Sequence, residues 1–89
     1  MSETYHLYIL HSKTLGRYYT GISHDPETRL HYHNTSHKGW TCRGRPWKLM
    51  FLREFANRDS AFKAERFVKA QKSSNFITRL ISGEFTLDP

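Results

Sequence analysis

The sequence predicts a small α/β (α+β) fold in which a three-stranded, mostly antiparallel sheet is flanked by helices, in the order β-β-α-β-α-α. Two short aromatic runs, residues 5–10 and 18–22, are separated by a turn that contains Gly16. A third apolar run, residues 47–55, follows a polar and basic segment. These runs are too short for buried helices and rich in strand-forming residues, whereas helix-capping residues follow the second and third runs.

Composition narrows the classes of function. At 89 residues we expect one domain, residues 1–89, with a core over about 5–82. The formal net charge of +6 favours an acidic partner, with nucleic acid as the leading candidate. Cys42 is the single cysteine, so no intramolecular disulfide is possible. No signal peptide and no run of about 18 apolar residues is present, so we expect a cytoplasmic protein that does not engage a membrane.

The first two strands are predicted to form a hairpin. Gly16 closes its turn, and in the second strand Tyr19 and Gly21 share one face. Tyr8 lies in the first strand, and its hydroxyl would converge with that of Tyr19 if the register allows. A glycine inside a strand marks either a close backbone approach or a β-bulge. Gly21 therefore either leaves room for a substrate beside Tyr19 or forms a bulge, and residue type alone does not decide.

A helix is predicted to begin after Asp25, which suits the N-cap, with Pro26 at its first position, and to end near Thr35. Arg29 and His33 are four residues apart, so they share a face and would contact the same anion. By residue type alone, Arg29 would be a solvated arginine and His33 a surface or capping residue near a helix end.

The segment 35–46 is predicted to be a surface loop beside this helix. It carries Lys38, Arg43 and Arg45 around the aromatic ring of Trp40. Basic groups interleaved with an aromatic ring neutralise phosphates and stack on bases, so this loop is expected to contact nucleic acid. The alternative is an ordinary solvated loop with Trp40 folded back onto the core.

The third strand is predicted over residues 47–55, partly covered by helices on both faces. Strict alternation would direct one set of side chains to one face: Trp47, Leu49, Phe51 and Phe55. The other face would receive Lys48, Met50, Leu52 and Glu54.

A longer helix is predicted from about residue 60 to 71 or 72, capped by residues 57–60. Glu65 lies at the border of the apolar stripe of this helix, where burying an unpaired carboxylate costs free energy. By residue type alone, an ion pair with Arg66 or Lys69 would explain it. The predicted stripe consists of Ala61, Ala64, Phe67 and Val68.

A last helix is predicted over residues 76–82, with caps offered by residues 73–75 and a stop at Gly83. Asn75 suits a cap better than a contact with the site. Residues 84–89 are expected to form a loosely held tail.

Six histidines raise the question of a metal site, in particular His31, His33 and His37 with Cys42 nearby. Their spacing fits none of the usual zinc patterns, so structural zinc is not expected.

Three features together resemble the GIY-YIG nuclease superfamily. His6-Leu7-Tyr8 stands in place of Gly-Ile-Tyr, Tyr19-Thr20-Gly21 keeps the tyrosine and glycine of the second motif, and the following helix carries Arg29 and His33 in order. The sequence is most similar to small stand-alone bacterial members, which resemble the nuclease module of the excision-repair protein UvrC and homing endonucleases. The resemblance covers about residues 5–81.

This resemblance implies a metal-dependent DNA endonuclease that acts in DNA repair or recombination. Arg29 would clamp the scissile phosphate, and His33 would orient substrate or nucleophile. Glu65 would hold Mg²⁺ or Mn²⁺. Either Tyr8 or Tyr19 would assist deprotonation of the attacking water, while the other positions it. The residues expected to contact DNA are Lys38, Trp40, Arg43, Arg45 and Lys72, with Asn75 a weaker candidate.

Two other classes of function stay open at this stage. A nuclease scaffold also serves as a nucleic-acid-binding module with weak or no cleavage, because fold does not secure function. A structural adaptor for a repair complex is the third possibility. A partner protein would supply DNA specificity in any of these cases, and the sequence leaves the oligomeric state and the DNA substrate open.

Overall fold

The sheet is built from three strands, β1 (Tyr5–Ser12), β2 (Arg17–Ser23) and β3 (Trp47–Phe55), in a computed structural model that describes residues 4–36 and 38–87. The spatial order is β2-β1-β3 and both pairings are antiparallel. The helices are α1 (Pro26–Thr35), α2 (Arg58–Ala70) and α3 (Ser74–Ile81), with a short 3₁₀ helix, η1 (Trp40–Gly44). The predicted fold class and element order are confirmed, although η1 occupies part of the predicted loop.

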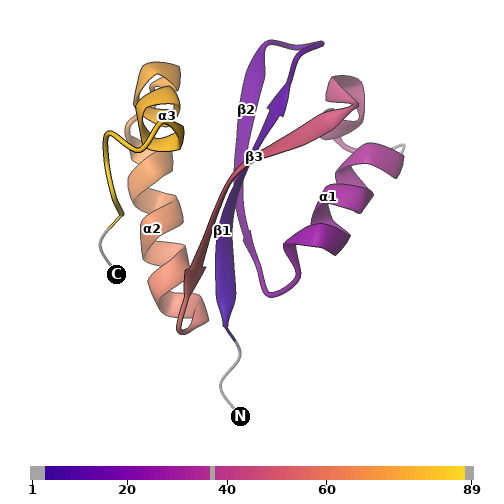
Figure 1. The fold of residues 1–89 in the computed structure, drawn as a ribbon. Helices are drawn as coiled ribbons and strands as arrows, with labels where there is room; N and C mark the ends of the chain where they lie inside the picture. Colours follow the sequence, from indigo (N-terminus) through magenta and orange to yellow (C-terminus); the bar gives the residue numbers. More distant parts are fainter. Residues whose placement is uncertain (1–3, 37, 88–89) are drawn as a thin grey trace.

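The sheet is the middle of three layers. Figure 1 shows α1 on one side of it and α2 with α3 on the other. Successive side chains of β1 point to opposite faces, so Leu7 and Ile9 pack against α2 and α3, and Tyr8 and Leu10 lie on the side of α1. β2 and β3 form the two edges of the sheet. Along the part of the chain that the structure describes, no helix is long and apolar enough to cross a membrane.

The predicted alternation of β3 is wrong because a β-bulge interrupts it. Leu10 pairs with Leu49 and Ile9 with Phe51, so Met50 is an extra residue opposite the step between them. The bulge switches the faces: Trp47 packs beside Tyr8 and Leu10, whereas Phe51 and Phe55 join the core under α2.

Local capping explains where the helices begin. The Asp25 carboxylate accepts from the backbone N–H of Thr28 at 3.2 Å, and α1 ends at Thr35 as predicted. The Asn57 side chain accepts from the N–H of Ser60 at 2.9 Å, so α2 begins at Arg58, two residues before the predicted start.

The predicted apolar stripe of α2 is partly wrong. Ala61, Ala64 and Val68 are buried, but Phe67 is 52% exposed. Its ring meets that of Phe76 from α3 at a centroid distance of 5.9 Å. Phe67 therefore covers the junction of the two helices and does not enter the core.

The C-terminal segment also differs from the prediction. Ser73 is the N-cap of α3 and accepts from the N–H of Phe76 at 3.1 Å, so Asn75 is not the cap and lies exposed in the first turn. Leu87 is 5% exposed within the core, and Phe85 stacks on Phe76 at 5.2 Å. The predicted loose tail from residue 84 is therefore packed as far as Leu87, and residues 88 and 89 lie outside the described part of the chain.

Candidate active site

Tyr8 and Gly21 face each other across β1 and β2 on the side of α1. A Cβ atom on Gly21 would lie 2.6 Å from the Tyr8 hydroxyl oxygen and 2.7 Å from its Cζ. The register of β1 and β2 is continuous at this pair, so Gly21 does not form a bulge. The absent side chain leaves room for the ring of Tyr8, and not, as one interpretation of the sequence had it, for a substrate beside Tyr19.

His33 reaches the same place from α1 and is only 3% exposed. Its Nε2 lies 3.5 Å from the Tyr8 hydroxyl oxygen, and its Nδ1 lies 3.3 Å from the Thr41 hydroxyl oxygen of η1. Burial lowers the pKa of His33 below its ordinary value, and the positive charge of Arg29 lowers this pKa further. The imidazole is therefore neutral at neutral pH, with one nitrogen donating and the other accepting.

Tyr19 completes an aromatic group on this face. Its ring centroid lies 4.6 Å from that of His33 and 6.2 Å from that of Tyr8. Tyr8 is 1% exposed, whereas Tyr19 is only partly buried and lines an open hollow. The two tyrosines therefore converge, as the hairpin predicted, but they differ in access to solvent.

Arg29 lies one helical turn before His33 and is exposed. Its guanidinium lies 5.0 Å from the ring centroid of Tyr32. Interaction with the Tyr8 hydroxyl raises the pKa of Arg29, so the guanidinium stays charged. Burial raises the pKa of Tyr8 and outweighs the opposing effect of Arg29, so Tyr8 keeps its proton at neutral pH.

Glu65 lies on α2, in the layer on the other side of the sheet. Its carboxylate accepts from the Lys69 ammonium at 3.3 Å, and its side chain is 14% exposed. The contact is the ion pair that residue type alone suggested. The structure thus gathers Tyr8, Tyr19, Arg29 and His33 on one face and places Glu65 apart from them, on α2.

A hollow of about 350 Å³ at the edge of β2 links the two layers. Tyr19 and Trp40 line it from the side of α1, and Lys69, the partner of Glu65, lines it from α2. The hollow therefore lies between the aromatic group and the Glu65–Lys69 pair. Its complete lining is Tyr18, Tyr19, Thr20, Trp40, Val68, Lys69, Lys72, Ser73 and Ile77.

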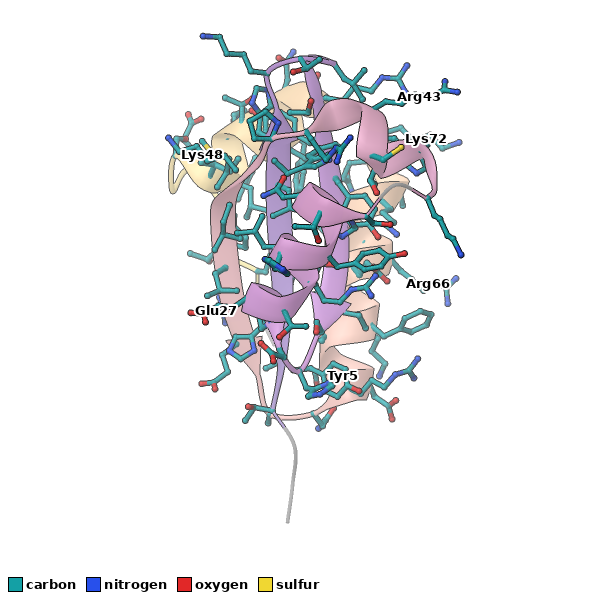
Figure 2. The ribbon with its side chains drawn as sticks, turned by 90° about the vertical axis from the view of Figure 1, so that its right-hand side faces the viewer. Tyr5, Glu27, Arg43, Lys48, Arg66 and Lys72 are labelled. Atoms are coloured by element: carbon teal, nitrogen blue, oxygen red, sulfur yellow. The ribbon has the colours of Figure 1, made fainter. Side chains whose placement is uncertain are left out.

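The residues predicted to contact nucleic acid differ in their surroundings. Lys38, Arg43 and Lys72 are exposed, and Figure 2 shows Arg43 and Lys72 extending on the same side of the molecule. Arg45 is partly buried, and its Nε donates to the Cys42 carbonyl at 2.9 Å. Trp40 is 49% exposed, although its ring also rests against that of Trp47. The four exposed or half-exposed side chains are available for contact, while Arg45 is engaged within its own loop.

The sequence did not reveal Thr41 or Asn34 as parts of this site. The Thr41 carbonyl accepts from the Trp47 indole at 2.7 Å, so this threonine ties His33 to the core. Asn34 donates to the Trp47 carbonyl at 3.1 Å and accepts from its backbone N–H, which holds the end of α1 against β3. Threonine and asparagine in this setting carry no distinctive spacing, so only the three-dimensional contacts identify them.

The donor set can be tested against a divalent metal. Within residues 4–36 and 38–87, no three His, Cys, Asp or Glu side chains are grouped to hold an ion. His33 uses both ring nitrogens on hydroxyls, and His37 lies outside the described residues. Mg²⁺, however, needs only one or two carboxylates when waters and substrate phosphates supply the remaining oxygens. Glu65 fits that requirement once the flexible, 56%-exposed Lys69 side chain moves aside.

Comparison with known proteins places this fold in a class of nuclease-type catalytic domains. The family model described as the GIY-YIG catalytic domain matches residues 4–78, and the chain belongs to the GIY-YIG family. The chain is also 33% identical, over 73 residues, to a UPF0213 protein of Streptococcus pneumoniae serotype 4 (strain ATCC BAA-334 / TIGR4). That alignment covers 81% of this chain and 73% of the relative. No solved structure matches the chain.

Proposed function

We propose that the protein is a metal-dependent endonuclease that hydrolyses DNA phosphodiesters in repair or recombination. The observation that carries this proposal is the convergence of Tyr8, Tyr19 and His33, with Arg29 beside them, on one face of a GIY-YIG domain. A packed core does not require an arginine whose charge acts on the buried hydroxyl of Tyr8. We also propose that residues 1–89 act as a single domain.

Arg29 binds the scissile phosphate in this proposal. Its exposed guanidinium remains charged and presents a planar set of donors, which suits two oxygens of one phosphate. The same charge stabilises the negative charge that grows on those oxygens in the transition state.

Tyr19 contacts the attacking water, and Tyr8 positions it. Tyr19 lines the open hollow, whereas Tyr8 is buried and keeps its proton. The Tyr8 hydroxyl lies 3.5 Å from His33 Nε2 and the Thr41 hydroxyl lies 3.3 Å from Nδ1, and one nitrogen of the neutral imidazole donates while the other accepts. To act as a general base a tyrosine must first be a phenolate, a form that the metal or the positive charge of Arg29 would favour.

Glu65 would hold Mg²⁺ or Mn²⁺. Such an ion, when bound, polarises the phosphate and stabilises the leaving oxygen. The Lys69 ammonium lies 3.3 Å from the Glu65 carboxylate, so Lys69 would have to turn away for Glu65 to act as a ligand.

DNA approaches along the exposed basic residues Lys38, Arg43 and Lys72, with Trp40 lining the same hollow as Lys72 and Arg45 bonded to Cys42 within the loop. The net charge of +6 supports attraction to DNA but carries no sequence preference. A partner protein would supply that specificity.

A nucleic-acid-binding module with weak or no cleavage is the second candidate. The ion pair of Glu65 with Lys69 favours it, because a carboxylate already neutralised by a neighbour has a stable role without metal.

Cleavage of labelled duplex, nicked, flapped and branched DNAs with Mg²⁺ or Mn²⁺ tests the proposal. We expect metal-dependent cutting that both Arg29→Ala and Glu65→Ala lower by roughly 100-fold or more. Arg58→Ala and Glu54→Gln are matched controls, because they remove an exposed arginine and an exposed carboxylate outside the site. Circular dichroism establishes that each variant is folded.

Absence of cutting by the wild type on every substrate, together with salt-sensitive DNA binding, would contradict the nuclease and support the binding module. Equal losses in the control variants would contradict the assigned site, since general charge would then explain the effect.

A further inference from the structure

We propose that the hollow at the β2 edge binds one unpaired nucleotide of a DNA strand, with its base stacked on Trp40 and its phosphate at Lys72. This inference rests on the proposed DNA-directed function. It names the substrate class more closely, as DNA with a single-stranded segment at the site.

The aromatic wall of the hollow is held in place and yet open. Trp40 rests edge-on against Trp47 at a centroid distance of 5.8 Å and against Tyr19 at 5.9 Å. Trp47 is 3% exposed and fixed in the core, whereas Trp40 keeps 49% of its surface exposed. A large ring that is supported from two sides and half open to solvent loses little freedom when a flat ligand stacks on it.

The geometry selects an unpaired base. In a duplex the faces of each base are covered by its stacked neighbours, so an aromatic side chain in a hollow cannot reach them. Single strands expose both faces, and stacking on aromatic side chains is their usual mode of recognition. The volume of about 350 Å³ is at the small end of the range of roughly 300–1,000 Å³ that small-ligand sites span, which suits one nucleotide.

The opposite wall provides the positive charge. Lys69 and Lys72 line the hollow together with Ser73, and none of the residues that line it is acidic. Lys69 is engaged by Glu65 at 3.3 Å, which leaves the exposed Lys72 to contact a phosphate. Figure 2 shows Lys72 and Arg43 on the same side of the molecule, so a strand leaving the hollow continues along positive charge.

Binding titrations without divalent metal test this site. The probes are a labelled single-stranded DNA of 12 or so nucleotides and the same sequence as a duplex, at one low salt concentration. We expect the single strand to bind at least about tenfold more tightly and to quench tryptophan emission, because a stacked base contributes about 1–3 kcal/mol, or roughly 5- to 150-fold.

Trp40→Leu keeps an apolar contact with Trp47 and removes the stacking surface. We expect it to weaken single-strand binding about tenfold, to abolish the quenching, and to leave duplex affinity within about twofold. Phe62→Leu is the matched control, because Phe62 is an exposed aromatic residue of α2 that does not line the hollow. Lys72→Gln provides a second variant at an exposed position with little risk to folding, and it should also weaken the single strand more than the duplex.

Three results would overturn the inference: equal wild-type affinity for single strand and duplex, equal loss of both in Trp40→Leu and Lys72→Gln, or the same loss in Phe62→Leu. Because these titrations contain no metal, they are independent of cleavage. Selective single-strand binding without cutting would support this nucleotide site and contradict the nuclease proposal. Cutting without selective single-strand binding would support the nuclease proposal and contradict this site.

Discussion

His33 lies between two hydroxyl groups, and its burial has a consequence for pH. Its pKa is lowered from the ordinary value of 6.5 by burial first and by Arg29 second. The unfolded chain therefore takes up this proton at a higher pH than the folded chain. The contribution of His33 to stability is complete above pH 6.5 and declines as the pH falls from there to the lowered pKa.

His33→Gln should accordingly flatten the decline of unfolding free energy as the pH falls below 6.5, as measured by urea denaturation. His31→Gln, an exposed position on the same helix, should keep the wild-type pH dependence. An unchanged slope in His33→Gln would mean that the buried imidazole is not the group whose protonation opposes folding.

The ring of Tyr8 is expected to require a glycine at position 21. Gly21→Ala places a Cβ 2.6 Å from the Tyr8 hydroxyl, so we expect a loss of about 1–3 kcal/mol in unfolding free energy from overpacking. Tyr8→Leu removes the colliding atoms, so the double variant should be more stable than the sum of the two single losses indicates. Strict additivity, measured by chemical denaturation, would show that the two residues are not in conflict.

At this scale the sequence predicted that Tyr8, Tyr19, Arg29 and His33 would lie together, but it also grouped with them Glu65, which lies on α2 beside Lys69. Tyr8, Tyr19, Arg29 and His33 stand out by strand pairing, helical spacing and family motif. Thr41 is eight residues from His33 along the chain and becomes its partner only because η1 folds under α1. A hydroxyl in a loop has no periodic signal that would indicate such a contact.

Among the elements, α2 carries Glu65, the proposed metal ligand. Lys69 competes with any cation for the Glu65 carboxylate. Lys69→Met should therefore tighten Mn²⁺ binding by about two- to fivefold, the effect expected for removing a partly exposed ion pair. Electron paramagnetic resonance of free Mn²⁺ measures this without any cleavage.

Lys63→Met is the control, because it removes a lysine from an exposed position of the same helix. Adding Glu65→Gln to Lys69→Met should abolish the gain. An equal tightening of Mn²⁺ binding in Lys63→Met would show that the loss of one positive charge, and not the release of Glu65 from Lys69, explains the gain.

The elements also show where sequence patterns stop being informative. The starts of α1 and α2 follow from Asp25 and Asn57, whose side chains bond the first turns. The bulge at Met50 leaves no trace in an alternating run, because any residue fits the extra position, yet it sends Trp47 and Phe51 to opposite faces. The exposure of Phe67 likewise depends on α3, which no local pattern locates.

At the scale of the whole molecule, the C-terminal segment closes the core beneath α2 and α3. Leu87→Ala should lower the unfolding free energy by about 2–4 kcal/mol, because the side chain is 5% exposed. Leu52→Ala, which removes the same atoms from a side chain that is 49% exposed, should cost less than about 1 kcal/mol. Equal losses in urea denaturation would mean that the segment is not part of the core. A short polar and aromatic tail gives little hint of this packing in the sequence.

We propose that groups from both sides of the sheet act as one site around the edge of β2. Arg29 lies on α1 and Glu65 on α2, and the hollow lined by Tyr19 and Lys69 lies between those layers. Residues that act as a unit have non-additive effects on rate, whereas independent contributions multiply.

The most direct test is the single-turnover cleavage rate of Arg29→Ala, Glu65→Ala and the double variant on the best DNA substrate with Mn²⁺. We expect the double variant to be little slower than the slower single variant. Losses that multiply, or a wild type that does not cut, would contradict a single site shared by the two layers.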